Sequence, residues 1–163
     1  MSYFEELSNI ESVLTKEAKK EVYVVDSSVI LKWFYVKDEN DVDIAKLIYR
    51  KALSRNFYLI SPELLVYELL NIFRYKTDFS KDRIEEIVKK IFYIQIIGQL
   101  DYKTYLNSYS ISQEINESIY DCIYIAMSEK YRASLITADE KLCSKAKKNN
   151  YDVVLLTEFA ELY

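Results

Sequence analysis

Short apolar runs separated by helical patterns are the feature of this sequence that most restricts its fold. Four such runs, rich in β-branched and aromatic residues, occur at residues 22–25, 57–60, 134–137 and 152–156. Between them, apolar residues recur at the three- and four-residue spacing of amphipathic helices. Strands that alternate with helices favour a mostly parallel sheet covered on both faces. We therefore expect an α/β domain.

The helical patterns divide the rest of the chain. They predict helices at residues 27–35, 41–54, 61–75, from 80, 102–114, 118–131, 139–148 and 157–163. Ser61-Pro62-Glu63 predicts a helix start, with serine as the cap and proline in the first turn. The segment IQIIGQL, residues 94–100, suits either a helix end or a strand. We expect an N-terminal helical extension at residues 1–20 and one domain at residues 21–163.

Composition excludes several kinds of chemistry. The 163 residues include no histidine and one glycine, which excludes Ser-His-Asp and His-metal sites and glycine-rich phosphate loops. Cys122 and Cys143 have no metal or redox spacing, so we expect two buried thiols. The formal net charge of −4 gives no overall attraction for nucleic acid. We find no transmembrane run or signal peptide and expect a cytoplasmic protein.

Four acidic residues stand where a parallel sheet collects its ligands. Asp26 directly follows the first predicted strand, and Asp139 follows the strand at 134–137 after one alanine. Glu68 and Asp121 interrupt apolar stretches of predicted helices. Carboxylates that cluster repel one another unless a cation neutralises them, and Mg²⁺ and Mn²⁺ prefer oxygen ligands. In a chain without histidine, this set predicts a site for a hard divalent cation.

Each acid also has a purely structural interpretation. Asp26 could cap the helix that follows it, and Glu68 could lie on a solvated helix face. Ser118-x-x-Asp121 and Thr137-x-x-Glu140 both match a capping box, which would make Asp139 a first-turn charge. Taken singly, these interpretations are favoured, and only the set of four favours a cation site.

The acidic residues and their surroundings resemble a known family. The segments are VVDSSVILKW, PELLVYELLNIFR, IYDCIYIAM and LITADEKL, in that order along the chain. They look like the four acidic motifs of PIN-domain proteins, and the likeness is greatest to the VapC-type toxins of toxin–antitoxin pairs. The resemblance covers about residues 21–160. It implies a three-layer α/β/α fold with a central parallel sheet.

The resemblance also implies an activity and roles for residues. The activity is ribonuclease cleavage that depends on Mg²⁺ or Mn²⁺. The positions that match the family's catalytic, metal-binding acids are Asp26, Glu68, Asp121 and Asp139. The positions that match supporting polar residues are Ser28, Asn71 and Thr137. Implied partners are an RNA substrate, a small VapB-like antitoxin and a second copy of the chain. The many apolar and aromatic residues also favour a homodimer.

Two features depart from the family pattern, and other functions stay open. Residues 1–20 precede the usual start of such domains, and the chain is acidic. The candidate phosphate contacts are Arg74, Lys141, Lys145, Lys147 and Lys148. Lys145–Lys148 also suits a solvated helix end, and that interpretation is favoured. One alternative is an inactive PIN-like module that binds RNA or protein. Another is a phosphatase of haloacid dehalogenase type, disfavoured because Ser28 stands where that family has a second aspartate.

Overall fold

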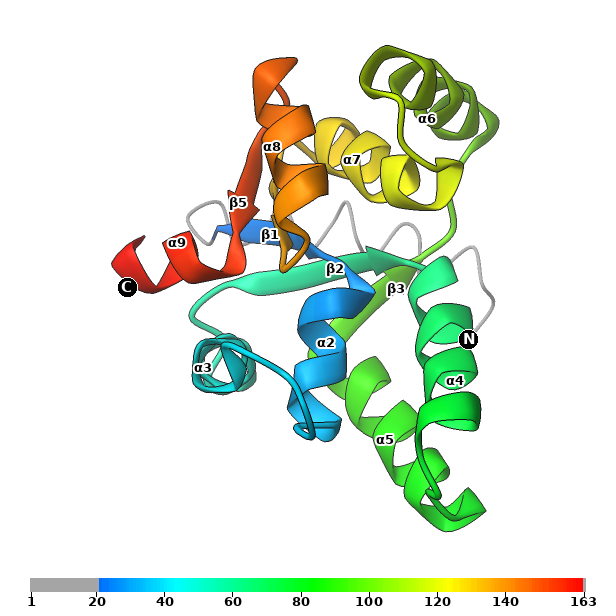
Figure 1. The fold of residues 1–163 in the computed structure, drawn as a ribbon, viewed down its shortest axis with the longest axis vertical. Helices are drawn as coiled ribbons and strands as arrows, with labels where there is room; N and C mark the ends of the chain where they lie inside the picture. Colours follow the sequence, from blue (N-terminus) through cyan, green and yellow to red (C-terminus); the bar gives the residue numbers. More distant parts are fainter. Residues whose placement is uncertain (1–20, 163) are drawn as a thin grey trace.

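A parallel sheet of five strands lies at the centre of residues 21–162, the part of the chain that the computed structural model describes (Figure 1). The strands are β1 (Val22–Val25), β2 (Tyr58–Pro62), β3 (Gln95–Gly98), β4 (Ser134–Thr137) and β5 (Val153–Leu155). Their order across the sheet is β3-β2-β1-β4-β5, and every neighbouring pair is parallel. The predicted extension at residues 1–20 lies outside the described residues.

Helices cover both faces of the sheet. They are α2 (Ser27–Phe34), α3 (Val42–Leu53), α4 (Leu64–Lys76), α5 (Lys81–Ile94), α6 (Tyr102–Ile115), α7 (Ile119–Tyr131), α8 (Glu140–Lys148) and α9 (Leu156–Leu162). In Figure 1, α6, α7 and α8 lie on one side of the sheet, and α2, α3 and α5 lie on the other. The expected three-layer α/β/α fold is therefore confirmed.

Two hydrophobic cores follow from the alternation of side chains along each strand. Tyr23 and Val25 of β1 point into the core shared with α2, α3, α4, α5 and α9. Val24, between them, points into the core shared with α6, α7 and α8. Cys122 and Cys143 are buried in the second core as free thiols, as the sequence predicted. Both faces of the central strand are apolar because both are covered.

The predicted helix start at Ser61 is wrong. Strand β2 continues through Pro62, and α4 begins at Leu64 after Glu63. Ser61 is buried, and its hydroxyl donates a 2.6 Å hydrogen bond to the carbonyl oxygen of Val25 on the neighbouring strand. A tertiary contact has therefore replaced the expected cap. The ambiguous segment 94–100 contains β3, and the other predicted elements agree with the structure within one or two residues.

The order of the strands fixes where a site can form. The chain passes from β1 to β2 and β3 on one side, then crosses to β4 and β5 on the other. In open parallel sheets, ligands bind beyond the carboxyl ends of the strands where the order reverses, which here is between β1 and β4. In the described part of the chain, no helix is both long and apolar enough to cross a membrane.

Candidate active site

Asp26 lies at this switch point, immediately after β1. Its backbone N–H donates to the carbonyl oxygen of Ile136 on β4, at 3.3 Å. Its side chain caps α2 by accepting a 2.9 Å hydrogen bond from the N–H of Ser28, so the capping interpretation is correct. The residue is nevertheless only 6% exposed. Burial raises the pKa of the Asp26 carboxyl to about 6, and Glu68 adds a smaller repulsion.

Two hydroxyl groups, those of Ser28 and Thr137, donate hydrogen bonds to the Asp26 carboxylate. The Ser28 hydroxyl donates to Asp26 Oδ1 and accepts a 2.9 Å hydrogen bond from the N–H of Ala138. The Thr137 hydroxyl donates to the Asp26 carboxylate and accepts from the N–H of Asp139 at 3.0 Å. Because each hydroxyl bridges two turns, the pair fixes the end of β1 to the end of β4.

Glu68 reaches the same region from the second turn of α4. Its Oε2 atom accepts a 2.6 Å hydrogen bond from the hydroxyl of Tyr124 on α7, and Ser27 also donates to this carboxylate. Burial raises the pKa of Glu68, and the neighbouring charge of Asp121 raises it further. The carboxylate is thus held by two donors from two other helices rather than lying free in water.

Asp121 lies in the first turn of α7 and is partly buried. Its N–H donates to the Ser118 hydroxyl oxygen at 3.1 Å, and that hydroxyl donates to Asp121 Oδ2 at 2.6 Å. The predicted Ser118-x-x-Asp121 capping arrangement is confirmed. The same carboxylate also repels Glu68, so a capping role and membership of the acidic group are compatible.

Three of the four predicted acids therefore come together. Asp26 interacts electrostatically with Glu68, and Glu68 interacts with Asp121. We call these three residues the acidic cluster. Among residues 21–162, no three Asp, Glu or Cys side chains are arranged as they stand to enclose a metal ion. The cluster brings carboxylate oxygens to the switch point, from one strand end and two helices.

Asp139 differs from the other three acids. It is exposed, and its Oδ1 accepts a 2.9 Å hydrogen bond from the N–H of Leu142, which makes it the N-cap of α8. The predicted Thr137-x-x-Glu140 box is wrong, because the cap falls two residues after Thr137. Asp139 still borders the acidic cluster: it and Asp121 both act electrostatically on Lys141.

The other predicted residues are spread over the surface. Asn71 is exposed on α4, one turn after Glu68. Arg74 is exposed in the last turn of α4, where its guanidinium lies 5.7 Å from the centre of the Tyr75 ring. Lys145 is held by Glu117, at 2.6 Å, and by the carbonyl oxygen of Asn116, at 2.7 Å. Neither Arg74 nor Lys145 contacts the acidic cluster through an interaction found in the described residues.

Lys141 is the predicted cation that lies nearest to the acids. Its ammonium is 2.9 Å from Glu117 Oε1, and its side chain is 72% exposed. The hydrogen bond with Glu117 raises the pKa of Lys141, and Asp139 and Asp121 contribute less. Lys141 therefore stays charged at the rim of the site, tethered at one end and open to solvent.

Tyr124 and Ser27 both contact the acidic cluster through Glu68, and the sequence analysis missed both. Tyr124 lies three residues after Asp121, on the same face of α7, and its side chain is buried. Burial and the adjacent Glu68 carboxylate raise the pKa of its hydroxyl, which stays protonated and donates. The three-residue spacing from Asp121 was the available signal, but among sixteen tyrosines it did not stand out.

Comparison with known proteins identifies the family of this chain. The sequence matches the PIN domain family over residues 23–148, which is most of the chain. The chain belongs to the PIN domain family. The match includes all four predicted acids, β1 from its second residue, and the whole of β2, β3 and β4. A comparison with curated proteins found no match.

Solved structures share the fold of this PIN domain. PAE2754 from Pyrobaculum aerophilum is 17% identical, with a TM-score of 0.62, over 87% of this chain and 94% of that one. FitAB, solved bound to an IR36 DNA fragment, is 14% identical, with a TM-score of 0.63, over 82% and 94%. Mycobacterium tuberculosis VapC20, described as a Sarcin-Ricin loop cleaving toxin, is 11% identical, with a TM-score of 0.55, over 75% and 93%.

Proposed function

We propose that this PIN domain is a metal-dependent endoribonuclease, the toxin of a VapC-type toxin–antitoxin pair. The observation that carries the proposal is the burial of Asp26 beside Glu68 and Asp121 at the switch point of the sheet. The similarity in fold to VapC20, described as a Sarcin-Ricin loop cleaving toxin, and to FitAB supports the same proposed function. RNA is the proposed substrate because the similar toxin is described by the RNA loop that it cleaves.

The donor chemistry of the acidic cluster, rather than a closed arrangement of its side chains, suits a hard divalent cation. Two of its carboxyls have raised pKa values because burial and mutual repulsion disfavour their charged forms. A cation among them would relieve both effects, and carboxylate oxygens are the donors that Mg²⁺ and Mn²⁺ prefer. Such an ion supplies a water nucleophile at neutral pH and charge stabilisation on a phosphate oxygen. We therefore propose Mg²⁺ or Mn²⁺ as the cofactor.

The residues around the cluster have distinct proposed roles. Asp26, Glu68 and Asp121 would hold the cation. Ser28 and Thr137 keep the Asp26 carboxylate in place, and Tyr124 does the same for Glu68. Asp139 and Asn71 would act at the rim, where both are exposed. Lys141 is the proposed phosphate contact, because it stays charged beside Asp121 and Asp139.

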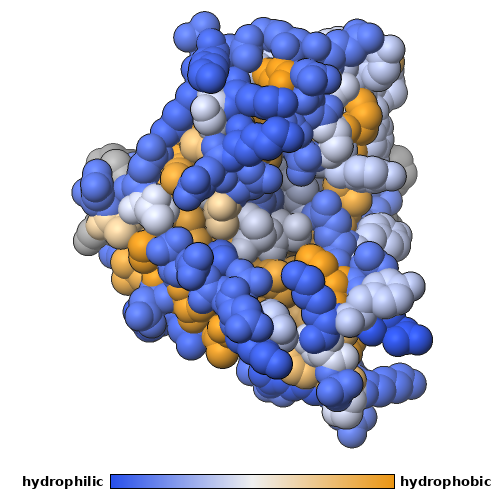
Figure 2. Space-filling model, in the orientation of Figure 1, coloured by the Kyte–Doolittle hydropathy of each residue, from blue (hydrophilic) through white to orange (hydrophobic). Residues whose placement is uncertain are grey.

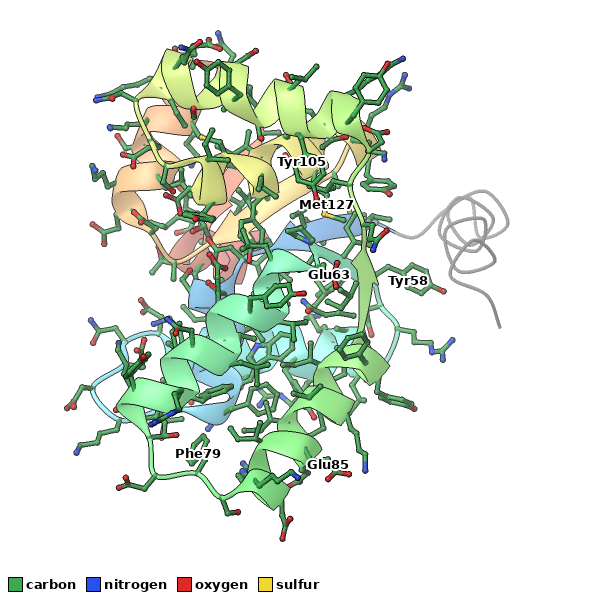
Figure 3. The ribbon with its side chains drawn as sticks, turned by 90° about the vertical axis from the view of Figure 1, so that its right-hand side faces the viewer. Tyr58, Glu63, Phe79, Glu85, Tyr105 and Met127 are labelled. Carbon is green, nitrogen blue, oxygen red and sulfur yellow. The ribbon has the colours of Figure 1, made fainter. Side chains whose placement is uncertain are left out.

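The proposed partners are a VapB-like antitoxin and a second copy of this chain. Large apolar and aromatic side chains are exposed on α4 and α6, which both lie on the side that Figure 3 faces, where Tyr105 is labelled. They include Tyr67, Tyr75, Tyr102, Tyr105, Leu106 and Tyr109. The face in Figure 2 is largely hydrophilic, with separate hydrophobic areas between the hydrophilic ones. We propose the α4–α6 side as the homodimer surface.

We also propose that the protein acts in the cytoplasm, because free buried thiols and an RNA substrate are both typical of that compartment.

The test is cleavage of a structured RNA by the purified chain. Cleavage should require Mg²⁺ or Mn²⁺ and stop when EDTA removes the ion. Asp26→Asn and Asp121→Asn should each remove the activity while circular dichroism and gel filtration report an unchanged fold. Cleavage that continues in EDTA contradicts the metal-dependent reaction. RNA binding without cleavage under every metal condition favours the inactive binding module instead.

A further inference from the structure

A cavity of about 300 Å³ lies between α2, α3 and α5, apart from the acidic cluster. Its lining includes four cations and three aromatic residues: Lys46, Arg50, Arg83, Lys90, Trp33, Phe34 and Tyr49. We call it the basic pocket. It shares no lining residue with the acidic cluster, and it lies at the C-terminal end of α2, whereas Asp26 caps the N-terminal end. This pocket plays no part in the function proposed above.

The charges of the basic pocket are not balanced. Glu86 accepts from Arg83, at 2.7 Å, and from Lys90, at 2.6 Å. Within residues 21–162, neither Lys46 nor Arg50 forms an ion pair. The pocket therefore has four cationic lining residues, and Glu86 is the one carboxylate that forms ion pairs with them in the described residues. The formal net charge of the chain is −4. A local surplus of positive charge against an acidic background favours a bound anion.

The aromatic wall adds a second observation. Trp33 is 8% exposed, and its Nε1–H is buried without a hydrogen-bond partner in the described residues. Its ring meets that of Tyr49 edge to face, with centroids 5.1 Å apart. An indole N–H without a partner is unusual for a buried donor. The lining of the pocket thus combines an excess of cations with aromatic surface, which includes a tryptophan whose buried N–H has no partner in the described residues.

We propose that the basic pocket binds a small phosphate-bearing ligand. Lys46 and Arg50 would hold the phosphate, since an arginine fork can pair two phosphate oxygens and a phosphate group brings three acceptors. In a nucleotide, the base would lie against Tyr49 or Trp33. The volume suits a ligand of this size, at the lower end of the range of small-molecule pockets. Free phosphate and a nucleotide share the chemistry, and titration distinguishes them.

The single tryptophan of the chain makes the test direct, because Trp33 lines the pocket. Trp33 fluorescence is followed during titration with inorganic phosphate, adenosine monophosphate and adenosine, and calorimetry repeats each titration. Adenosine monophosphate should bind and adenosine should not. Equal affinity for inorganic phosphate and adenosine monophosphate identifies free phosphate as the ligand, and tighter binding of the latter identifies a nucleotide.

Matched variants locate the binding. Arg50→Gln and Lys46→Gln should each lower the affinity for adenosine monophosphate by about fivefold or more, because a hydrogen bond to a charged group is lost. Lys89→Gln is the control: it removes the same charge from α5, at a residue that is 74% exposed, pairs with Glu85 and lies outside the pocket. It should change the affinity by less than about twofold, as expected for an exposed charge.

Four results would overturn the proposal. The first is that no phosphate compound binds, and the second is that adenosine binds as tightly as adenosine monophosphate. The third is that Arg50→Gln changes the affinity as little as Lys89→Gln does. The fourth is that a tetraglutamate peptide binds more tightly than the nucleotide. Asp26→Asn separates this site from the acidic cluster. It should leave the titration unchanged, and a loss of binding in that variant would place the ligand among the carboxylates rather than in the basic pocket.

Discussion

The turns after β1 and β4 are alike in sequence position but differ in environment. Asp26 and Asp139 both follow parallel strands at the same edge, and both cap the next helix through a 2.9 Å hydrogen bond from a backbone N–H. Asp26 is 6% exposed, whereas Asp139 is open to solvent. A capping role therefore does not distinguish the two acids. Burial beside other carboxylates does, and it makes Asp26 the more informative residue.

The sheet order explains the difference. Strand β1 is central, between β2 and β4, so its end is covered by the starts of α4 and α7 as well as α2. Strand β4 has only the three-residue β5 on its other side, and α8 begins at a more open edge. The Thr137 hydroxyl connects the two turns, because it donates to Asp26 and accepts from the N–H of Asp139.

The largest predicted difference between the two turns is in RNA cleavage. Asp26→Asn should lower the rate by at least about 100-fold, since even groups that only orient a metal ligand contribute 10–100-fold. Asp139→Asn keeps the helix cap and changes only an exposed group at the rim, so the cleavage rate of this variant should fall by no more than about tenfold. Initial rates at saturating Mn²⁺ measure both. Equal losses in the two variants would show that burial does not separate their roles.

The next largest predicted difference between the two turns is in how the free energy of unfolding depends on pH when no divalent metal is present. The pKa of Asp26 rises from its ordinary 3.8 to about 6 in the folded chain. Between these values the folded state binds more protons than the unfolded state, so stability falls as pH rises and the full penalty is present above pH 6. The penalty is about 3 kcal/mol.

Asp26→Asn should reduce this fall by the part due to Asp26 and make the metal-free protein more stable at neutral pH, while Glu68, whose pKa is also raised, keeps its own part. Denaturant unfolding at several pH values between about 4 and 7 measures the slope. Asp139→Asn makes the same chemical change at the exposed cap of the other turn and is the matched control. A slope that is unchanged in Asp26→Asn would mean that another group carries the proton.

The connection between the turns should contribute less. Thr137→Val keeps the shape of a fully buried side chain but removes its hydroxyl. The N–H of Asp139 and the carboxylate of Asp26 then each lose a partner, so unfolding should become easier by about 1–3 kcal/mol. A double-mutant cycle with Asp26→Asn should show coupling between the two positions. Strict additivity would contradict the hydrogen bond between them.

The smallest predicted effect concerns Glu68. Tyr124→Phe removes the hydroxyl that donates to Glu68 Oε2, a contact that favours the charged carboxylate. The pKa of Glu68 should then rise further, and the acidic limb of the pH–rate profile should move to higher pH. A lower rate without that movement would indicate a packing role for Tyr124. Tyr120→Phe, at an exposed tyrosine on the same helix, is the control.

The fold was more predictable than the site. Strand and helix periods placed the elements because both cores depend on regular apolar spacing, as in Val24 and its neighbours. Ser61 was misassigned because its partner, Val25, lies 36 residues away. The acidic positions could be found from strand ends and family motifs. Their different burial could not, because it depends on which helices cover β1, and neither could the contact between Tyr124 and Glu68, 56 residues apart.

The most direct test of the acidic cluster is the thermal response to Mn²⁺. An ion that binds only the folded chain should stabilise it by about 2.7 kcal/mol at one hundred times its dissociation constant. The unmodified chain and Asp139→Asn should therefore melt at higher temperature when Mn²⁺ is added. Asp26→Asn should start from a higher metal-free melting temperature and gain much less from the ion. An equal gain in all three proteins would contradict the assignment of Asp26 as a ligand.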